Sequence, residues 1–241
     1  MNKVYRVMLV LIITFFYSCK QKFTNTEQES SLPSLENGNW RYTKNDVVLK
    51  SGKYIDGYKI GSWKYRINNE VQNLYWFIYE NSQIKVNHPK SWRITDNGEY
   101  LFYSIVNKEK GDFFIIKRQN KKEINLNLDS YFNEAVTALS GSNIGHINNY
   151  ACVRLEYEKR NAYYLSLDVE KENLKSAYYI FYTEDNDSIY DITFKVNGEN
   201  EKINKEIFAG MVYSINIKGE KLFHNDDELT ASKEIKIEDL Y

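Results

Sequence analysis

Strict alternation of apolar and polar residues dominates the chain beyond residue 80 and predicts mostly β-strands. Val153, Leu155 and Tyr157 alternate with charged residues, and the segment AYYIFYTED (177–185) is apolar on both of its faces. A period of two indicates a half-buried strand, and a run that is apolar on both faces belongs at the centre of a sheet. We therefore predict strands at 84–94, where a Pro-centred turn interrupts the run, and at 100–106, 113–119, 151–159, 163–171, 177–185, 188–196 and 213–219.

Two segments carry the spacing of a helix instead. Between Asn127 and Leu139, the apolar residues recur at intervals of three and four, with Asn127 placed to cap the start and Gly141 to end the helix. A second apolar face appears downstream, made of Ile203, Ile207, Phe208, Met211 and Val212. Because the links between successive strands are short, we expect antiparallel pairing. The fold class predicted for residues 79–219 is thus α+β, one antiparallel sheet flanked by helices.

An internal repeat precedes this region. GNWRY at 38–42 recurs as GSWKY at 61–65, a period of 23 residues. Trp40, Tyr42, Trp63 and Tyr65 would all lie on one face of their strands. The segment 38–78 resembles the bacterial variant of the MORN repeat, and the resemblance implies β-hairpins and, in some arrays, contact with lipid or protein. The alternative is that these aromatic residues only pack.

The later region also resembles a known family. The order of its elements, the Pro-x-x-Trp sequence at Pro89 and Trp92, and a final helix leading into Tyr213–Ser214–Ile215 are similar to the PsbP-like α/β/α sandwich. Small bacterial lipoproteins and secretion chaperones belong to that family. The resemblance implies a domain that presents binding surfaces.

The N-terminus carries a short apolar run between a basic start and a cysteine. Lys3 and Arg6 precede residues 7–16, of which only Thr14 is polar, and Ser18 stands directly before Cys19. A run of this length is typical of a secretory signal and too short to span a bilayer. Residues 1–18 resemble a bacterial lipoprotein signal, which implies cleavage before Cys19 and lipid on that cysteine. An uncleaved anchor helix is the alternative.

The resemblance also implies a location. Lys20 stands where an Asp typically retains lipoproteins in the inner membrane, so the expected site is the outer membrane, facing the periplasm or, alternatively, exposed at the surface. Residues 19–37 are polar and predict a disordered tether. Residues 220–241 form a C-terminal tail, in which the alternating segment 233–241 suits an edge strand.

Composition narrows the range of partners. The formal charge is −1, and removal of residues 1–18 would bring it to −3, so no basic footprint for nucleic acid is present. Once Cys19 carries lipid, Cys152 has no cysteine with which to form an intramolecular disulfide. The 21 tyrosines suit half-exposed strands, since tyrosine combines an apolar ring with a polar tip.

Candidate chemistry is sparse. His88, His146 and His224 stand at no spacing typical of metal ligands, and Cys152 has no histidine placed beside it. Asp226, Asp227 and Glu228 beside His224 are expected to form a solvated charged segment. We therefore predict no cofactor, no metal and no catalysis. The predicted function is a membrane-anchored, non-catalytic module that binds a protein of the cell envelope. The alternative is an envelope hydrolase, for example one that acts on carbohydrate with paired carboxylates.

Overall fold

The computed structural model describes residues 37–44, 47–96, 98–157, 160–197, 200–222 and 230–234. The predicted signal, Cys19 with nearly all of its tether, and His224 with its acidic neighbours lie outside the described residues. Within that part of the chain, no helix is long and apolar enough to cross a membrane.

The first sheet is built mainly from consecutive hairpins. Its strands pair in the order β1-β2-β3-β4-β5-β13-β14, all antiparallel. Residues with positive φ make the hairpin turns, Asp56 and Gly57 in one and Asn68 and Asn69 in the next. The strand bounds are β1 Asn37–Lys44, β2 Val47–Ile55, β3 Tyr58–Ile67, β4 Glu70–Glu80, β5 Ile84–Pro89, β13 Asn216–Ile217 and β14 Glu220–Lys221.

The second sheet is larger and also antiparallel in its pairings. Its order is β15-β9-β10-β11-β12-β8-β7-β6, so β11 lies inside the sheet, as its two apolar faces predict. The strand bounds are β6 Arg93–Ile94, β7 Phe102–Asn107, β8 Asp112–Asn120, β9 His146–Tyr157, β10 Arg160–Lys171, β11 Leu174–Glu184, β12 Ser188–Asn197 and β15 Thr230–Glu234.

Helices cover both faces of the second sheet. α3 (Leu128–Gly141) begins as predicted, with the Asn127 side chain accepting a hydrogen bond from the Ser130 amide at 2.8 Å. α4 (Glu201–Val212) lies on the opposite face of the sheet, and its buried residues include Ile203, Ile207, Phe208, Met211 and Val212, the predicted apolar set. A short helix, α2 (Lys121–Ile124), follows β8 and has no counterpart in the prediction.

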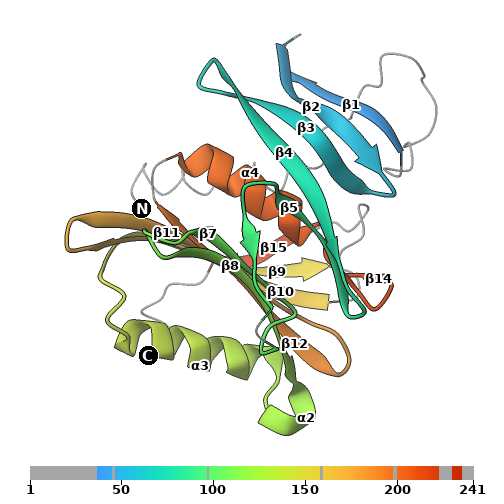
Figure 1. The fold of residues 1–241 in the computed structure, drawn as a ribbon. Helices are drawn as coiled ribbons and strands as arrows, with labels where there is room; N and C mark the ends of the chain where they lie inside the picture. The colour runs from blue at the N-terminus through green and yellow to red at the C-terminus, as the bar shows by residue number, and fades with distance from the viewer. Residues whose placement is uncertain are drawn as a thin grey trace.

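The layers run from the first sheet through α4 and the second sheet to α3 (Figure 1). One hydrophobic core joins the first three layers, from Trp63 and Trp76 through Phe208 to Phe114 and Phe194. A second core fills the space between the second sheet and α3, with Phe132 stacked on Tyr163 at 4.0 Å between ring centroids. α4 is therefore an internal layer that faces a sheet on each side.

The fold is α+β with antiparallel sheets, but the prediction of a single sheet is wrong. β5 pairs with β4 and β13 rather than with β7, and so belongs to the first sheet. The predicted boundary between residues 78 and 79 falls within β4. Hydrophobic alternation identifies a strand but does not reveal which sheet it joins.

Candidate functional site

The aromatic residues of the repeat point inward, toward α4. Tyr42, Trp63 and Tyr65 are buried, and Trp40 is partly buried against the same core. Edge-to-face contacts link them through Tyr54, whose ring centroid lies 5.6 Å from that of Trp40 and 4.9 Å from that of Trp63. In the described structure these four predicted residues therefore form packing contacts.

A lysine occupies the centre of this inner face. The Lys59 ammonium lies 4.8 Å from the ring centre of Trp63, 5.1 Å from Trp76 and 5.5 Å from Tyr65. It also donates a hydrogen bond to the Tyr65 hydroxyl at 3.2 Å, and that oxygen accepts another from Trp76 Nε1 at 3.1 Å. Cation–π attraction and hydrogen bonds thus hold Lys59 where β3 and β4 meet α4.

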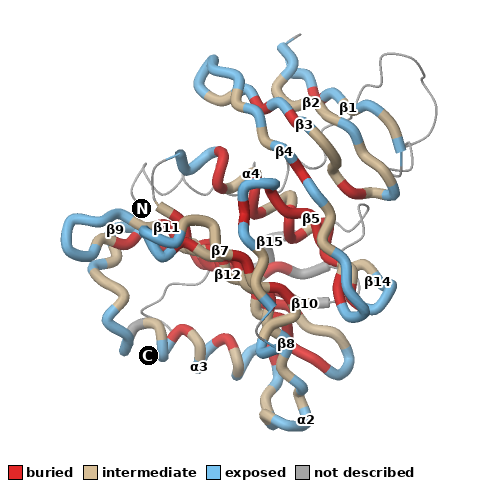
Figure 2. Tube along the Cα trace, in the orientation of Figure 1, coloured by how far each residue is buried: buried red, intermediate tan, exposed pale blue. Residues whose placement is uncertain are grey.

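The opposite face is exposed along β1–β3 and along β4 as far as Phe77, and we call this part the outer face; beyond it, Tyr79 packs on Phe102 of the second sheet, with ring centroids 5.3 Å apart. Because side chains alternate along a strand, the residues between the buried aromatic ones point away from α4. Figure 2 shows exposed positions interleaved with buried ones in these strands. Exposed residues on the outer face include Arg41, Lys53, Lys64, Arg66, Val71, Asn73, Tyr75 and Phe77.

Two exposed aromatic side chains of β4 form the apolar centre of the outer face. Tyr75 and Phe77 remain 52% and 42% exposed, and their ring centroids lie 5.9 Å apart. Lys90 lies over both rings, with its ammonium 5.5 Å from the centre of Tyr75 and 5.7 Å from that of Phe77. His88, the cross-strand neighbour of Phe77, is buried next to the pair, and its burial lowers the pKa of the imidazole from 6.5.

Further cations lie on the same face, on β3 next to β4 and on β1. Arg41 pairs with Ser51, and Ser51 pairs with Lys64, so the two cations occupy one rung of the sheet two strands apart. Arg66 lies two residues further along β3 and pairs with Val71. Among the described residues, no carboxylate forms an ion pair with Arg41, Lys64 or Arg66. The outer face therefore combines exposed aromatic rings with positive charge that no described acid neutralises.

The outer face is not among the features predicted from the sequence, although the repeat carries a signal for it. In both copies of the Gly-x-Trp-x-Tyr motif, the residue between tryptophan and tyrosine is a cation, Arg41 in the first and Lys64 in the second. The aromatic positions of the motif form the face that packs on the core, and the positions between them form the exposed face.

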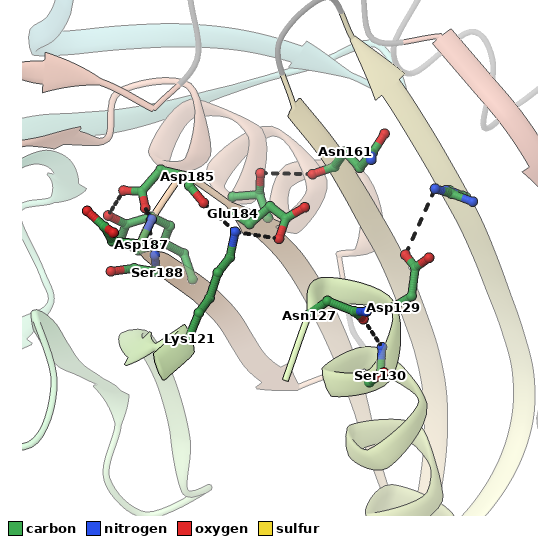
Figure 3. A network of polar contacts seen from close by, with 12 residues as sticks. Lys121, Asn127, Asp129, Ser130, Asn161, Glu184, Asp185, Asp187 and Ser188 are labelled. Atoms are coloured by element: carbon green, nitrogen blue, oxygen red, sulfur yellow. Dashed lines mark hydrogen bonds and ion pairs between the residues drawn. The ribbon is translucent and has the colours of Figure 1, made fainter. Parts of the chain in front are cut away.

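The acidic residues at the β11–β12 turn serve that turn. Asp185 accepts hydrogen bonds from the amides of Asp187 and Ser188 at 2.9 and 2.7 Å, and from the Tyr190 hydroxyl at 2.5 Å. Lys121 of α2 lies 2.8 Å from Glu184 in the same network (Figure 3). A hollow of about 310 Å³ adjoins this turn. The hydrogen bonds that Asp185 accepts close the hairpin, so its place in this turn explains the residue structurally.

The other candidate groups are separated. Cys152 is buried against the α3 core, and burial raises the pKa of its thiol to about 12, which suits a packing residue rather than a nucleophile. His88 lies in the first sheet, whereas His146 is exposed at the start of β9. Among the described residues, no group of three potential ligands forms a metal site.

Comparison with known proteins adds little. No family model matches the chain, and no curated protein matches it. Among solved structures, a protein from Bacteroides thetaiotaomicron VPI-5482 is similar to 59% of this chain, with 14% identity and a TM-score of 0.37. The match spans 47% of that protein's length, so this chain covers less than half of it.

Proposed function

We propose that this chain is a lipoprotein of the bacterial cell envelope that binds another protein through the outer face of its first sheet. The observation that carries the proposal is the exposed pair Tyr75 and Phe77, which shares its face with cations that no described acid neutralises. An aromatic centre with a charged rim is the usual anatomy of a protein interface. Neither catalysis nor a cofactor enters the proposal.

The anchor is the second part of the proposal. Cys19 follows a signal-like apolar run, and lipid on that residue would hold the chain at the outer membrane, on the periplasmic side. Residues 20–36, 17 in number, lie between Cys19 and β1, and as the predicted flexible tether they would reach roughly 20–25 Å on average. The first sheet would then be the folded part nearest to the membrane along the chain. The resemblances to MORN repeats and to PsbP-like lipoproteins and chaperones support a binding role rather than an enzymatic one.

Affinity purification from native membranes tests the binding role. Tagged full-length protein is expected to copurify a partner in stoichiometric amounts, and the Tyr75→Ser/Phe77→Ser variant is expected to lose it. A matched variant, Leu174→Ser, changes the most exposed large apolar residue, which lies on β11 away from the outer face, and should retain the partner. A partner that survives the Tyr75/Phe77 change, or the absence of any partner, would refute the assignment of this face.

Metabolic labelling with an alkyne fatty acid tests the anchor separately. The wild-type chain should incorporate the label and remain with the membrane fraction, because diacylated lipoproteins bind stably. Cys19→Ser should lose the label. Equal labelling of wild type and variant would rule out lipid attachment at Cys19.

A further inference from the structure

From the placement of its cations we infer that the outer face recognises an acidic protein surface, with partner carboxylates binding around Arg41, Lys64, Arg66 and Lys90 and an apolar group contacting Tyr75 and Phe77. This inference rests on the proposed binding function and names the chemistry of the partner.

The spacing of the cations follows from the register of the sheet. Neighbouring strands lie about 4.8 Å apart, so Arg41 and Lys64, separated by β2, have Cα atoms roughly 10 Å apart. Lys64 and Arg66 are two residues apart on one strand, which corresponds to roughly 7 Å. In an extended peptide, every second residue also lies roughly 7 Å further along the chain. Acidic residues at alternate positions of a partner strand could therefore meet both Lys64 and Arg66.

The charge of this face differs from that of the whole molecule. The chain carries a formal charge of −1, yet the described outer-face positions of β1–β4 include cations and no acidic residue. Asp56 lies in the β2–β3 turn. Glu70 and Glu80 are the first and last residues of β4, so neither lies beside Tyr75 in the exposed surface. A local positive surface on an acidic protein favours a partner of opposite charge and steers its approach.

The position of Lys90 favours a protein partner over a membrane. Its ammonium lies within 6 Å of both ring centres, so insertion of Tyr75 and Phe77 into a bilayer would bring a charge toward the hydrocarbon. A partner carboxylate can pair with Lys90 while an apolar side chain contacts the rings at the same time. The rings are also only about half exposed, so they lie against the sheet instead of projecting from it.

A defined peptide tests this chemistry. Full-length protein in non-ionic detergent is titrated into a fluorescein-labelled peptide of six Glu-Tyr repeats, and fluorescence anisotropy reports binding. We expect saturable binding that weakens at least tenfold in Lys64→Glu/Arg66→Glu and at least fivefold in Tyr75→Ala/Phe77→Ala. The matched charge reversal Lys122→Glu/Lys175→Glu alters exposed lysines elsewhere and should change affinity less than twofold. A peptide of Gln-Tyr repeats should bind at least tenfold more weakly.

Three outcomes would overturn the inference. The first is equal affinity for the glutamate and glutamine peptides, and the second is unchanged affinity in Lys64→Glu/Arg66→Glu. The third is displacement of the peptide by dihexanoyl phosphatidylglycerol at or below the peptide concentration, which would assign the face to lipid headgroups. Lys64→Gln/Arg66→Gln, checked by circular dichroism, provides a milder variant in case charge reversal unfolds the sheet. If a partner copurifies through Tyr75 and Phe77 but none of the charge changes matters, the proposed function stands and only this inference fails.

Discussion

At the residue scale, close packing gives single positions in the first sheet large effects. Gly52 lies beneath the Trp63 indole, and a Cβ atom there would lie 2.2 Å from Cδ2 of that ring. The Trp63 ring therefore leaves no room for a side chain at position 52, although the backbone dihedral angles there do not themselves require glycine. Such a restriction follows from a neighbour distant in sequence, which is why the repeat pattern alone does not reveal it.

Gly52→Ala should destabilise the protein. Forcing a methyl group into a filled core costs about 1–3 kcal/mol. Urea unfolding at pH 7.5 should show the loss. Gly141→Ala is the matched control, because nothing lies within 4 Å of a Cβ atom at that helical position, and alanine should be neutral or slightly stabilising there. Equal stability of wild type and Gly52→Ala would contradict the packing described for Trp63.

His88 should make stability sensitive to mild acid. Burial lowers its pKa in the folded state below the ordinary value of 6.5. As pH falls through 6.5, the unfolded chain therefore takes up a proton before the folded chain does, and the free energy of unfolding decreases. Phenylalanine at position 88 fits the aromatic neighbours Phe77 and Phe102, so His88→Phe should remove this part of the pH dependence of stability.

Urea unfolding at pH 7.5 and 5.5 measures the effect. Between these values, the wild type should lose more stability than His88→Phe, by at most about 1.4 kcal/mol. The exposed His146 serves as the control, and His146→Gln should follow the wild type. Identical pH dependence in all three proteins would show that His88 titrates normally when folded.

At the element scale, the sequence predicts strands and helices well, and their partners poorly. The alternation around Val153 and Leu155 and the cap at Asn127 are local signals, and both are confirmed. The pairing of β5 with β13 joins residues more than 130 positions apart, through Lys85 with Asn216 and Ile84 with Ile217. Nothing in either short segment marks the other as its partner, so the division of the strands between two sheets is not predictable from pattern.

Lys59 should stabilise the inner face of the first sheet, where its ammonium lies among Trp63, Tyr65 and Trp76. Lys59→Met keeps the aliphatic stem but removes the charge that three aromatic rings surround, and should cost about 1–2 kcal/mol. Lys64→Met is the matched control on the same strand, because Lys64 points to the exposed outer face and should change stability by less than about 0.5 kcal/mol. Thermal unfolding of both variants measures the difference. Equal stability of Lys59→Met and Lys64→Met would contradict this account.

At the scale of the whole molecule, α4 lies between the two sheets (Figure 1), and the face of β1–β3 and of the first part of β4 that points away from it remains exposed, whereas Tyr79 and His88 on the same face pack near Phe102 of the second sheet. The aromatic residues of the inner face are packed in the core. The outer face carries Tyr75, Phe77 and cations that no described acid neutralises. The sequence identifies the aromatic strands but not the uncovered face, because exposure depends on where α4 docks. The proposed lipid anchor at Cys19 would hold this architecture at a membrane, with the first sheet following the anchor along the chain.

Photocrosslinking in living cells tests this account most directly. p-Benzoylphenylalanine replaces Tyr75 on the outer face or, as a control, Leu174 on β11, in the full-length chain in its native cells. Our account predicts that irradiation at position 75 joins the chain to one discrete protein, that position 174 does not capture it, and that Lys64→Glu/Arg66→Glu abolishes the adduct. The absence of a protein adduct at position 75, or the same adduct from both positions, would contradict the claim that the outer face is a specific protein-binding surface.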